Sequence, residues 1–305
     1  MTESVAPSPA VGDSAAHHSF GLTDLLLLTM AVIWGVNFVV VKYATHIFNP
    51  VAFTGLRVGT AAAFLVAFAY ARGGFALSRH DVLRLLLLGV LGNGLYQLFF
   101  VHGVARTRAG NASLIVGAAP AFIAVAARFR GMERVKRMTL VGIALSMIGV
   151  ALVIVGSGTV SNGQTTLLGS VLVFLGVLCW SAYTIMLQPY TKRIDVIQLS
   201  AITLVGGAVP LIIASTPALV ATDWSSIGAG GWLALFYSSV ISMGVAYFFW
   251  YRGLRVLGPT RTAVYSNLQP IVALLAAWAL LGEVPTIFQG LGAVTIIAGV
   301  FLTRT

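Results

Sequence analysis

The chain consists largely of long apolar runs separated by short stretches in which Gly, Pro and charged residues gather. A membrane-spanning helix needs about 20 mainly apolar residues, with a range of about 17–25. Ten runs have this character, at residues 24–45, 49–71, 82–104, 109–128, 138–155, 166–188, 197–219, 230–251, 259–281 and 286–303. The pattern predicts an all-α integral membrane protein with ten transmembrane helices, in which Asn49-Pro50 and Gly258-Pro259 break runs that would otherwise merge.

A series of landmark residues occurs twice in the chain, 150 residues apart. The first series is Pro120, Glu133, Gly142 and Gly149, and the second is Pro270, Glu283, Gly292 and Gly299. The match predicts a duplication with five spans in each copy. Because five is an odd number, the second copy crosses the membrane in the opposite direction. Inverted repeats of this kind surround a central cavity in transporters that work by alternating access.

The duplication divides the chain into two repeats, residues 21–156 and 165–305, joined by a linker at 157–164. Residues 1–20 are rich in Ala, Ser and Pro and contain no Lys or Arg. A signal peptide requires a positively charged start, so this segment is predicted to be a short disordered tail.

The basic residues are distributed unequally between the two sides of the predicted bundle. The side of the N-terminus receives fourteen, namely Arg72, Arg79, Arg84, Arg128, Arg130, Arg134, Lys136, Arg137, Lys192, Arg193, Arg252, Arg255, Arg261 and Arg304. The other side receives Lys42, Arg106 and Arg108, and Arg57 lies inside a span. Since cytoplasmic loops are enriched in Lys and Arg, we expect both termini in the cytoplasm and the protein in the plasma (inner) membrane.

Composition supports the same class of protein. The chain is 58% hydrophobic and 9% charged, whereas soluble domains carry about 25% charged residues. The net charge of +10 does not indicate nucleic-acid binding, because the basic residues lie in short loops between apolar runs. The single cysteine, Cys179, excludes an internal disulfide. The expected partners are a small-molecule substrate and the lipid bilayer, and nothing in the sequence requires more than a monomer.

Several short motifs point to a known group of transporters. They are Trp34-Gly35-Val36-Asn37-Phe38, Pro50 followed by Arg57, Pro120 with Glu133 beyond it, and, in the second half, Trp180, Pro270 and Leu281-Gly282-Glu283. Over residues 22–303 the chain resembles the EamA-type ten-helix members of the drug/metabolite transporter superfamily. Arg130-Gly131-Met132-Glu133 departs from the usual Leu-Gly-Glu of that group.

The resemblance implies export or exchange of small metabolites, often amino acids, by alternating access without ATP hydrolysis. It also implies a central cavity lined mainly by helices 1, 3, 4, 6, 8 and 9. The aromatic content of these helices is similar to that of the branch that exports aromatic and other neutral amino acids.

Aromatic and amide residues in these helices are the candidate substrate-binding residues. They are Trp34, Asn37, Asn93, Tyr96, Gln97, Phe100, Trp180, Tyr183, Tyr247, Tyr265, Asn267 and Gln269. In the third span, four of them follow the spacing i, i+3, i+4 and i+7, which places them on one face of a helix. An amide in hydrocarbon needs a partner, so this face should turn inward. Contacts between helices are the alternative role for each of these residues.

The prolines, the two glutamates and the buried arginine are candidates for gating or structure. Pro120 and Pro270 each remove a backbone hydrogen bond inside a span and predict paired flex points. Glu133 and Glu283 end equivalent spans on opposite faces and could each latch one face, or could simply be interfacial acids. For Arg57, a structural or gating pair is favoured over capture of a substrate carboxylate.

The sequence lacks several signatures of other mechanisms. None of the eight Asp and Glu residues lies in the middle of a span, which disfavours a proton relay or a metal site. No G-x-x-x-x-G-K-[ST] motif is present, and no cofactor is expected. A transporter of nucleotide sugars, purine-like solutes or drugs is the alternative within the same fold. An integral membrane enzyme is disfavoured, because no cluster of His or acidic residues marks a catalytic site.

Overall fold

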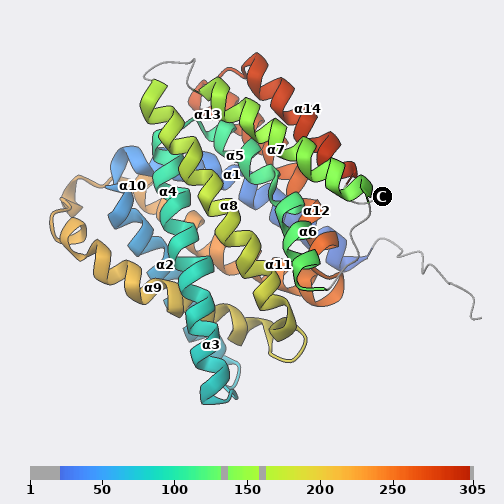
Figure 1. Ribbon diagram of the computed structural model, residues 1–305. Coiled ribbons are helices and arrows are strands. Elements are labelled where there is room, and N and C mark those ends of the chain that lie inside the picture. The colour runs from blue at the N-terminus through green and yellow to red at the C-terminus, as the bar shows by residue number, and fades with distance from the viewer. Residues whose placement is uncertain (1–20, 132–136, 158–162, 303–305) are drawn as a thin grey trace, which may run out of the picture.

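The computed structural model describes residues 21–131, 137–157 and 163–302, which form helices joined by short connections and contain no strand (Figure 1). The elements of the first half are α1 (Leu22–Ile47), α2 (Pro50–Ala71), α3 (Arg79–Gly89), η1 (Val90–Leu95), α4 (Tyr96–Arg106), α5 (Ala109–Gly117), α6 (Ala119–Phe129) and α7 (Arg137–Ser157). Those of the second half are α8 (Gly163–Thr191), α9 (Val196–Val220), η2 (Trp224–Ser226), α10 (Ala229–Phe236), η3 (Tyr237–Val245), α11 (Ala246–Val256), α12 (Pro259–Tyr265), η4 (Ser266–Leu268), α13 (Gln269–Leu281) and α14 (Ile287–Leu302). Of the four η elements, η1 and η3 are π-helical and the other two are 3₁₀ turns.

Consecutive elements combine into membrane-length helices. Within the described residues, eight continuous stretches are long and apolar enough to cross a bilayer, and the apolar helices Ala144–Val153 and Ile287–Gly299 are shorter. The eight are Leu22–Ile47, Pro50–Ala71, Arg79–Arg106, Ala109–Phe129, Leu167–Thr191, Val196–Val220, Ala229–Val256 and Pro259–Leu281. With the two shorter helices, which belong to α7 and α14, they correspond to the ten predicted spans.

Local sequence explains where the helices begin. Pro50 occupies the first turn of α2, where its missing N–H is not needed, and the Asn49 side chain accepts a hydrogen bond from the Val51 N–H at 2.9 Å. Pro259 begins α12 in the same way, after Gly258 at φ +82°. Both predicted breaks therefore lie at helix starts, which separates spans that hydropathy alone would merge.

The third span of each half is wound as a π-helix near its centre. The segment Val90–Leu95 forms η1, and residues 240–245, which are 150 positions further on, belong to η3. A π-helical turn shifts the hydrogen-bonding pattern, so it changes the direction of the side chains that precede it and leaves carbonyl groups available. The two repeats thus share an irregularity that hydropathy does not reveal.

The fourth span of each half is interrupted just before its proline. The helix preceding Pro120 ends at Gly117, and a 3₁₀ turn, η4, precedes Pro270. A methyl group built on Gly117 would come within 2.7 Å of the Pro270 ring, so the two interrupted segments cross in close contact. Each proline removes a helical hydrogen bond, which accounts for the interruptions.

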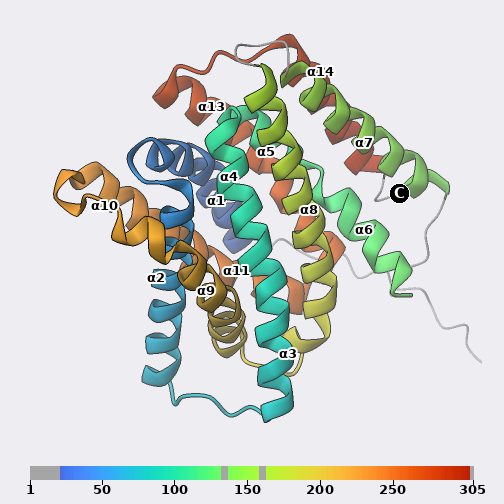
Figure 2. The ribbon, with the colours of Figure 1, turned by 60° about the vertical axis from the view of Figure 1, so that its left-hand side comes forward.

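The last helices of the two repeats, α7 and α14, lie side by side (Figures 1 and 2). A Cβ on Gly149 would lie 3.0 Å from the Gly292 carbonyl oxygen, and a Cβ on Gly299 would lie 2.5 Å from that of Gly142. Gly299 and Gly142 are the counterparts of Gly149 and Gly292 in the opposite repeats, so the second contact is equivalent to the first. Such reciprocal contacts arise when equivalent helices pack about a two-fold axis, and small residues permit the close approach.

Other helix contacts also occur in equivalent form in both repeats. Helix α1 packs against α11 and α13, and its counterpart α8 packs against α4 and α6. Helix α2 packs against its own counterpart α9. The structure therefore confirms an all-α fold of two inverted repeats, with the third and fourth spans of both repeats at the centre.

The outer surface of the bundle is apolar. Large side chains such as Ile213, Leu280 and Val294 are each 69% exposed. Soluble proteins rarely expose contiguous apolar surface on this scale, whereas a lipid-facing surface requires it. This surface confirms a multi-pass membrane protein.

Candidate functional site

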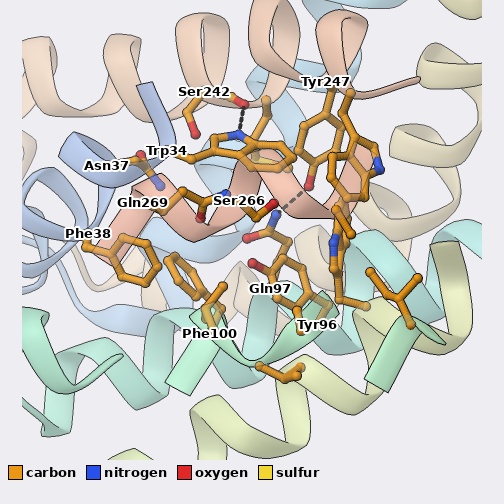
Figure 3. A pocket seen from close by; sticks show the side chains of 18 of the residues that line it. Trp34, Asn37, Phe38, Tyr96, Gln97, Phe100, Ser242, Tyr247, Ser266 and Gln269 are labelled. Carbon is orange, nitrogen blue, oxygen red and sulfur yellow. Dashed lines mark hydrogen bonds between the residues drawn. The ribbon is translucent and has the colours of Figure 1, made fainter. Parts of the chain in front are cut away.

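A cavity lies between the two repeats near the middle of the spans (Figure 3). Among the predicted binding residues, those that line it are Trp34, Asn37, Tyr96, Gln97, Phe100, Trp180, Tyr247 and Gln269. Its walls come from spans 1, 3, 4, 6, 8 and 9, and from α2 through Arg57. The free space inside the lining is about 40 Å³.

Four aromatic side chains of the lining form what we call the aromatic box: Trp34, Trp180, Tyr247 and Trp250. The Trp34 ring meets the Trp180 ring edge-on at 5.9 Å between centroids and the Trp250 ring at 5.5 Å. Trp180 in turn lies 5.7 Å from both Tyr247 and Trp250. Faces of aromatic rings attract cations and stack on planar solutes.

Hydrogen bonds fix two of the cavity residues (Figure 3). The Trp34 indole N–H donates to the Ser242 carbonyl at 2.9 Å, and the Gln97 amide donates to the Tyr247 hydroxyl at 2.9 Å. Ser242 lies in η3, where the π-helical winding leaves carbonyl groups for side chains to use. The Oδ1 atom of Asn37 and the Oε1 atom of Gln97 are buried without a partner among the described residues. They remain available as acceptors for a ligand.

The cavity residues pair across the repeats at the 150-residue offset. The pairs are Gln97 with Tyr247, Phe100 with Trp250, Val116 with Ser266, and Ala119 with Gln269. In the last two pairs the polar member belongs to the second repeat. The backbone geometry is thus nearly symmetric, while the chemistry of the two walls differs. A solute whose two ends differ matches such a cavity.

Asn93 does not share the cavity face with the other candidates of its span. It lies inside η1 and packs against Gly207 of α9, whereas Tyr96, Gln97 and Phe100 follow in regular α4. The predicted single face assumed 3.6 residues per turn throughout. The wider π-helical turns rotate Asn93 away from the face, so the expectation of one continuous face is wrong at this position.

Three further candidates also lie outside the cavity lining. Tyr183 is fully buried and its hydroxyl lies 2.6 Å from that of Tyr251, in a contact between α8 and α11. The Tyr265 hydroxyl donates to the Asp24 carboxylate near the first turn of α1. Asn267 is half-buried in η4, and the neighbouring Ser266 and Gln269 line the cavity instead. The 3₁₀ turn decides which of these neighbours faces inward.

Several cavity residues escaped the sequence reasoning. Trp250 completes the aromatic box, and Ser242 and Met243 also line the cavity. Trp250 could have been found, because it is the 150-residue counterpart of the candidate Phe100. Ser242 contributes a backbone carbonyl, which no side-chain pattern reports.

Glu283 closes the contact between α13 and α5 at one face of the bundle. Its carboxylate accepts from the backbone N–H groups of Ala109 and Gly110 at 3.2 and 3.3 Å, and Arg108 Nε lies 3.9 Å away. Arg108 also donates to the Val284 carbonyl at 2.6 Å. A carboxylate at the start of a helix is stabilised by the helix dipole. The predicted counterpart Glu133 lies outside the described residues.

The cavity offers no typical metal or catalytic site. Among the described residues no three His, Cys, Asp or Glu side chains gather in a way that could hold a metal ion. The lining combines aromatic rings, amides and one guanidinium. Aromatic rings, amides and a guanidinium are groups that can bind an organic solute.

Comparison with known proteins identifies the family. The EamA-like transporter family matches residues 21–155 and again residues 167–305, one match for each repeat. The chain belongs to the EamA-like transporter family. It is therefore a secondary transporter of the drug/metabolite transporter superfamily, as the sequence motifs predicted.

Individual relatives of this EamA-like chain span nearly its whole length. The uncharacterized transporter YyaM of Bacillus subtilis (strain 168) is 30% identical over 280 residues, which cover 90% of this chain and 91% of YyaM. A probable amino-acid metabolite efflux pump of Salmonella typhimurium (strain LT2) is 31% identical and covers 91% of this chain and 93% of its own. Its counterpart in Escherichia coli (strain K12) is also 31% identical, with the same coverage.

A solved crystal structure shares the fold at 20% sequence identity. It superposes with a TM-score of 0.65 and covers 91% of this chain and 94% of its own. The likeness extends to both repeats, which supports the arrangement of spans described above.

Proposed function

We propose that this transporter exports or exchanges small neutral amino acids, including aromatic ones, by alternating access without ATP hydrolysis. The observation that carries the proposal is the lining of the central cavity, which joins an aromatic box to unpaired amide oxygens and a single guanidinium. Neutral amino acids combine an apolar or aromatic side chain with two polar groups of opposite charge, so they complement such a lining. The efflux-pump relatives support the same substrate class.

The proposed cycle uses the inverted repeats as two bodies that rock around the cavity. The interruptions before Pro120 and Pro270 provide flexible points beside the cavity wall. Contacts such as that of Glu283 with the start of α5 would hold one face closed until the other opens. We further propose that both termini lie in the cytoplasm, in agreement with the excess of basic residues on that side. Labelling of terminal tags in intact cells tests this orientation.

The direct test is flux of labelled amino acids through the purified protein in liposomes. We expect saturable uptake of neutral amino acids, faster when the liposomes contain unlabelled substrate, and no requirement for ATP. If no amino acid gives saturable uptake while a purine-like or drug-like solute does, the substrate class is wrong and the alternative within the fold replaces it.

Two variants connect flux to the cavity. Tyr96→Ala removes a ring of the lining and should change the relative rates of aromatic and aliphatic amino acids. Tyr70→Ala is the matched control, because it removes a tyrosine ring that is 67% exposed and outside the lining, and its preference should equal that of the wild type. An unchanged preference in both variants would remove this cavity as the binding site.

A further inference from the structure

Arg57 is a fully buried cation in the wall of the cavity. It lies in α2 and is 1% exposed, between the rings of Phe53 and Phe100 at 5.9 and 5.8 Å. Its Nη2 atom donates to the Ser238 carbonyl at 3.4 Å, which is a long hydrogen bond. Its Nε and Nη1 atoms have no hydrogen-bond partner among the described residues. Three N–H groups of the guanidinium are therefore unused.

No carboxylate described in the structure neutralises this charge. The acidic residues of the described ranges are Asp24, Asp81, Asp195, Asp223 and Glu283, and their ion pairs join Asp81 to Arg193 and Glu283 to Arg108. Arginine stays protonated in proteins, so a positive charge persists inside the bundle. A buried unpaired charge is costly and marks a functional group when it faces a cavity.

Ring contacts connect Arg57 to the aromatic box. The Phe100 ring lies 5.8 Å from the guanidinium carbon and 5.7 Å from the Tyr96 ring. Tyr96 in turn lies 5.0 Å from Trp180 of the aromatic box. A chain of ring contacts thus runs from the cation to the box, within one cavity. The unpartnered oxygens of Asn37 and Gln97 belong to the same lining.

We propose that Arg57 binds the carboxylate of the transported solute, while the aromatic box and the amide oxygens receive its ammonium group and side chain. The proposal deepens the proposed function, on which it rests, by naming the group that recognises one end of an amino acid. A guanidinium forms short, charge-assisted hydrogen bonds with a carboxylate. A phosphate group matches less well, because its two negative charges would meet one cation and a mainly aromatic wall. Ring faces attract the ammonium group by cation–π interaction.

The first test changes the solute and leaves the protein intact. Wild-type protein in liposomes is given labelled phenylalanine in competition with unlabelled phenylalanine, its amide or phenethylamine, which lacks the carboxylate. Charge-assisted hydrogen bonds to a buried group correspond to roughly 10- to 100-fold in affinity. We expect the amide and the amine to compete that much more weakly than the amino acid. Equal competition by the three solutes would overturn the proposal.

The second test changes the protein. Arg57→Gln should reduce the preference for the amino acid over its amide to less than about threefold. The wild type should show a preference of roughly 10- to 100-fold, because it keeps the charge-assisted hydrogen bond. Arg57→Lys keeps the charge and should retain part of the preference. Arg193→Gln is the matched control, since it removes an exposed cation that pairs with Asp81 away from the cavity. Full wild-type preference in folded Arg57→Gln protein would overturn the proposal. If Arg57→Gln does not fold, the competition by the three solutes and the Arg57→Lys variant test the proposal instead. Arg57→Lys protein that prefers the amide over the amino acid would also contradict the proposal.

The outcomes separate this proposal from the proposed function. Saturable amino-acid flux without discrimination against the amide leaves the function standing and overturns the role of Arg57. Absent amino-acid flux, together with Arg57-dependent flux of other monocarboxylates, overturns the amino-acid assignment and supports the carboxylate site. Calorimetric titration of the protein in detergent with the same solutes gives an independent binding signal. No binding of any carboxylate-bearing solute would contradict the site.

Discussion

Substitution of Glu283 by Gln should loosen the face of the transporter at which α13 meets α5. The carboxylate there accepts two backbone N–H groups at the start of α5 and faces Arg108. Gln has nearly the same shape and keeps one acceptor oxygen, but it removes the negative charge. The substitution therefore isolates the electrostatic part of the contact.

The expected size follows from the geometry. A negative charge at a helix start contributes about 0.3–1 kcal/mol. The ion pair is long, at 3.9 Å, and partly exposed, with 21% and 14% of the two side chains accessible, so it adds about 0–1 kcal/mol. Their combined loss, about 0.3–2 kcal/mol, would increase the population open at this face by about 2- to 30-fold, if the closed form depends on this contact.

A single thiol in the cavity reports the opening. Cys179 is the only cysteine of the chain, so replacing it by Ala gives a background free of other thiols. Asn37→Cys then places a thiol at a cavity residue that is 4% exposed. The rate of its modification by a membrane-impermeant reagent, added at the Glu283 face, should rise about 2- to 30-fold in Glu283→Gln protein, in proportion to the open population.

Asp195→Asn provides the matched control. Asp195 also accepts two backbone N–H groups at a helix start, those of Ile197 and Gln198, but within its own helix α9. Its substitution weakens a helix cap without releasing a contact between the repeats. Equal modification rates in the wild type and in Glu283→Gln, or an equal rise in both acid variants, would refute a latch at Glu283.

Three further predictions concern the cavity and its packing. The Gln97–Tyr247 hydrogen bond joins the repeats. A double-mutant cycle of Gln97→Leu and Tyr247→Phe, measured by thermal unfolding in detergent, should therefore give a coupling free energy of about 0.5–1.5 kcal/mol. Additive effects of the two substitutions would contradict the bond. A Cβ on Gly92 would lie 2.6 Å from Cδ1 of the Tyr183 ring, so Gly92→Ala should destabilise the protein by about 1–3 kcal/mol; an unchanged Tm would show that the ring can move freely. The cavity lining contains no Asp, Glu, His or Lys. An imposed proton gradient of either sign should therefore change the initial rate of substrate flux by no more than about twofold. A larger stimulation would reveal a coupled proton.

The repeat could be derived from the sequence because its landmarks are local. Runs of apolar residues must match the thickness of the hydrocarbon layer, and Pro and Gly act on the backbone at their own positions. The starts at Pro50 and Pro259 and the interruptions at Pro120 and Pro270 follow from this chemistry. An odd number of spans in each copy then fixes the inverted arrangement.

The cavity lining was only partly predictable. Helical spacing placed Tyr96, Gln97 and Phe100 on one face, and the structure turns that face to the cavity. The same spacing failed at Asn93, because hydrogen bonds within the backbone produced a π-helical turn between it and the others. Residue type alone does not report where a membrane helix departs from 3.6 residues per turn.

By itself the sequence determined the fold class, the inverted repeat and the family, because these depend on residue pattern along the chain and on the thickness of a bilayer. Only the tertiary structure decided which polar groups share one cavity and which remain without a partner. Arg57 shows the difference. In the sequence it is a single charge inside a span, for which a structural or gating pair and capture of a substrate carboxylate are both open. In the structure its neighbours beyond its own helix come from α4 and η3, far along the chain, and they supply one ring and a carbonyl but no carboxylate. Whether a buried charge has a partner depends on what packs around it, and packing is fixed only when the helices assemble.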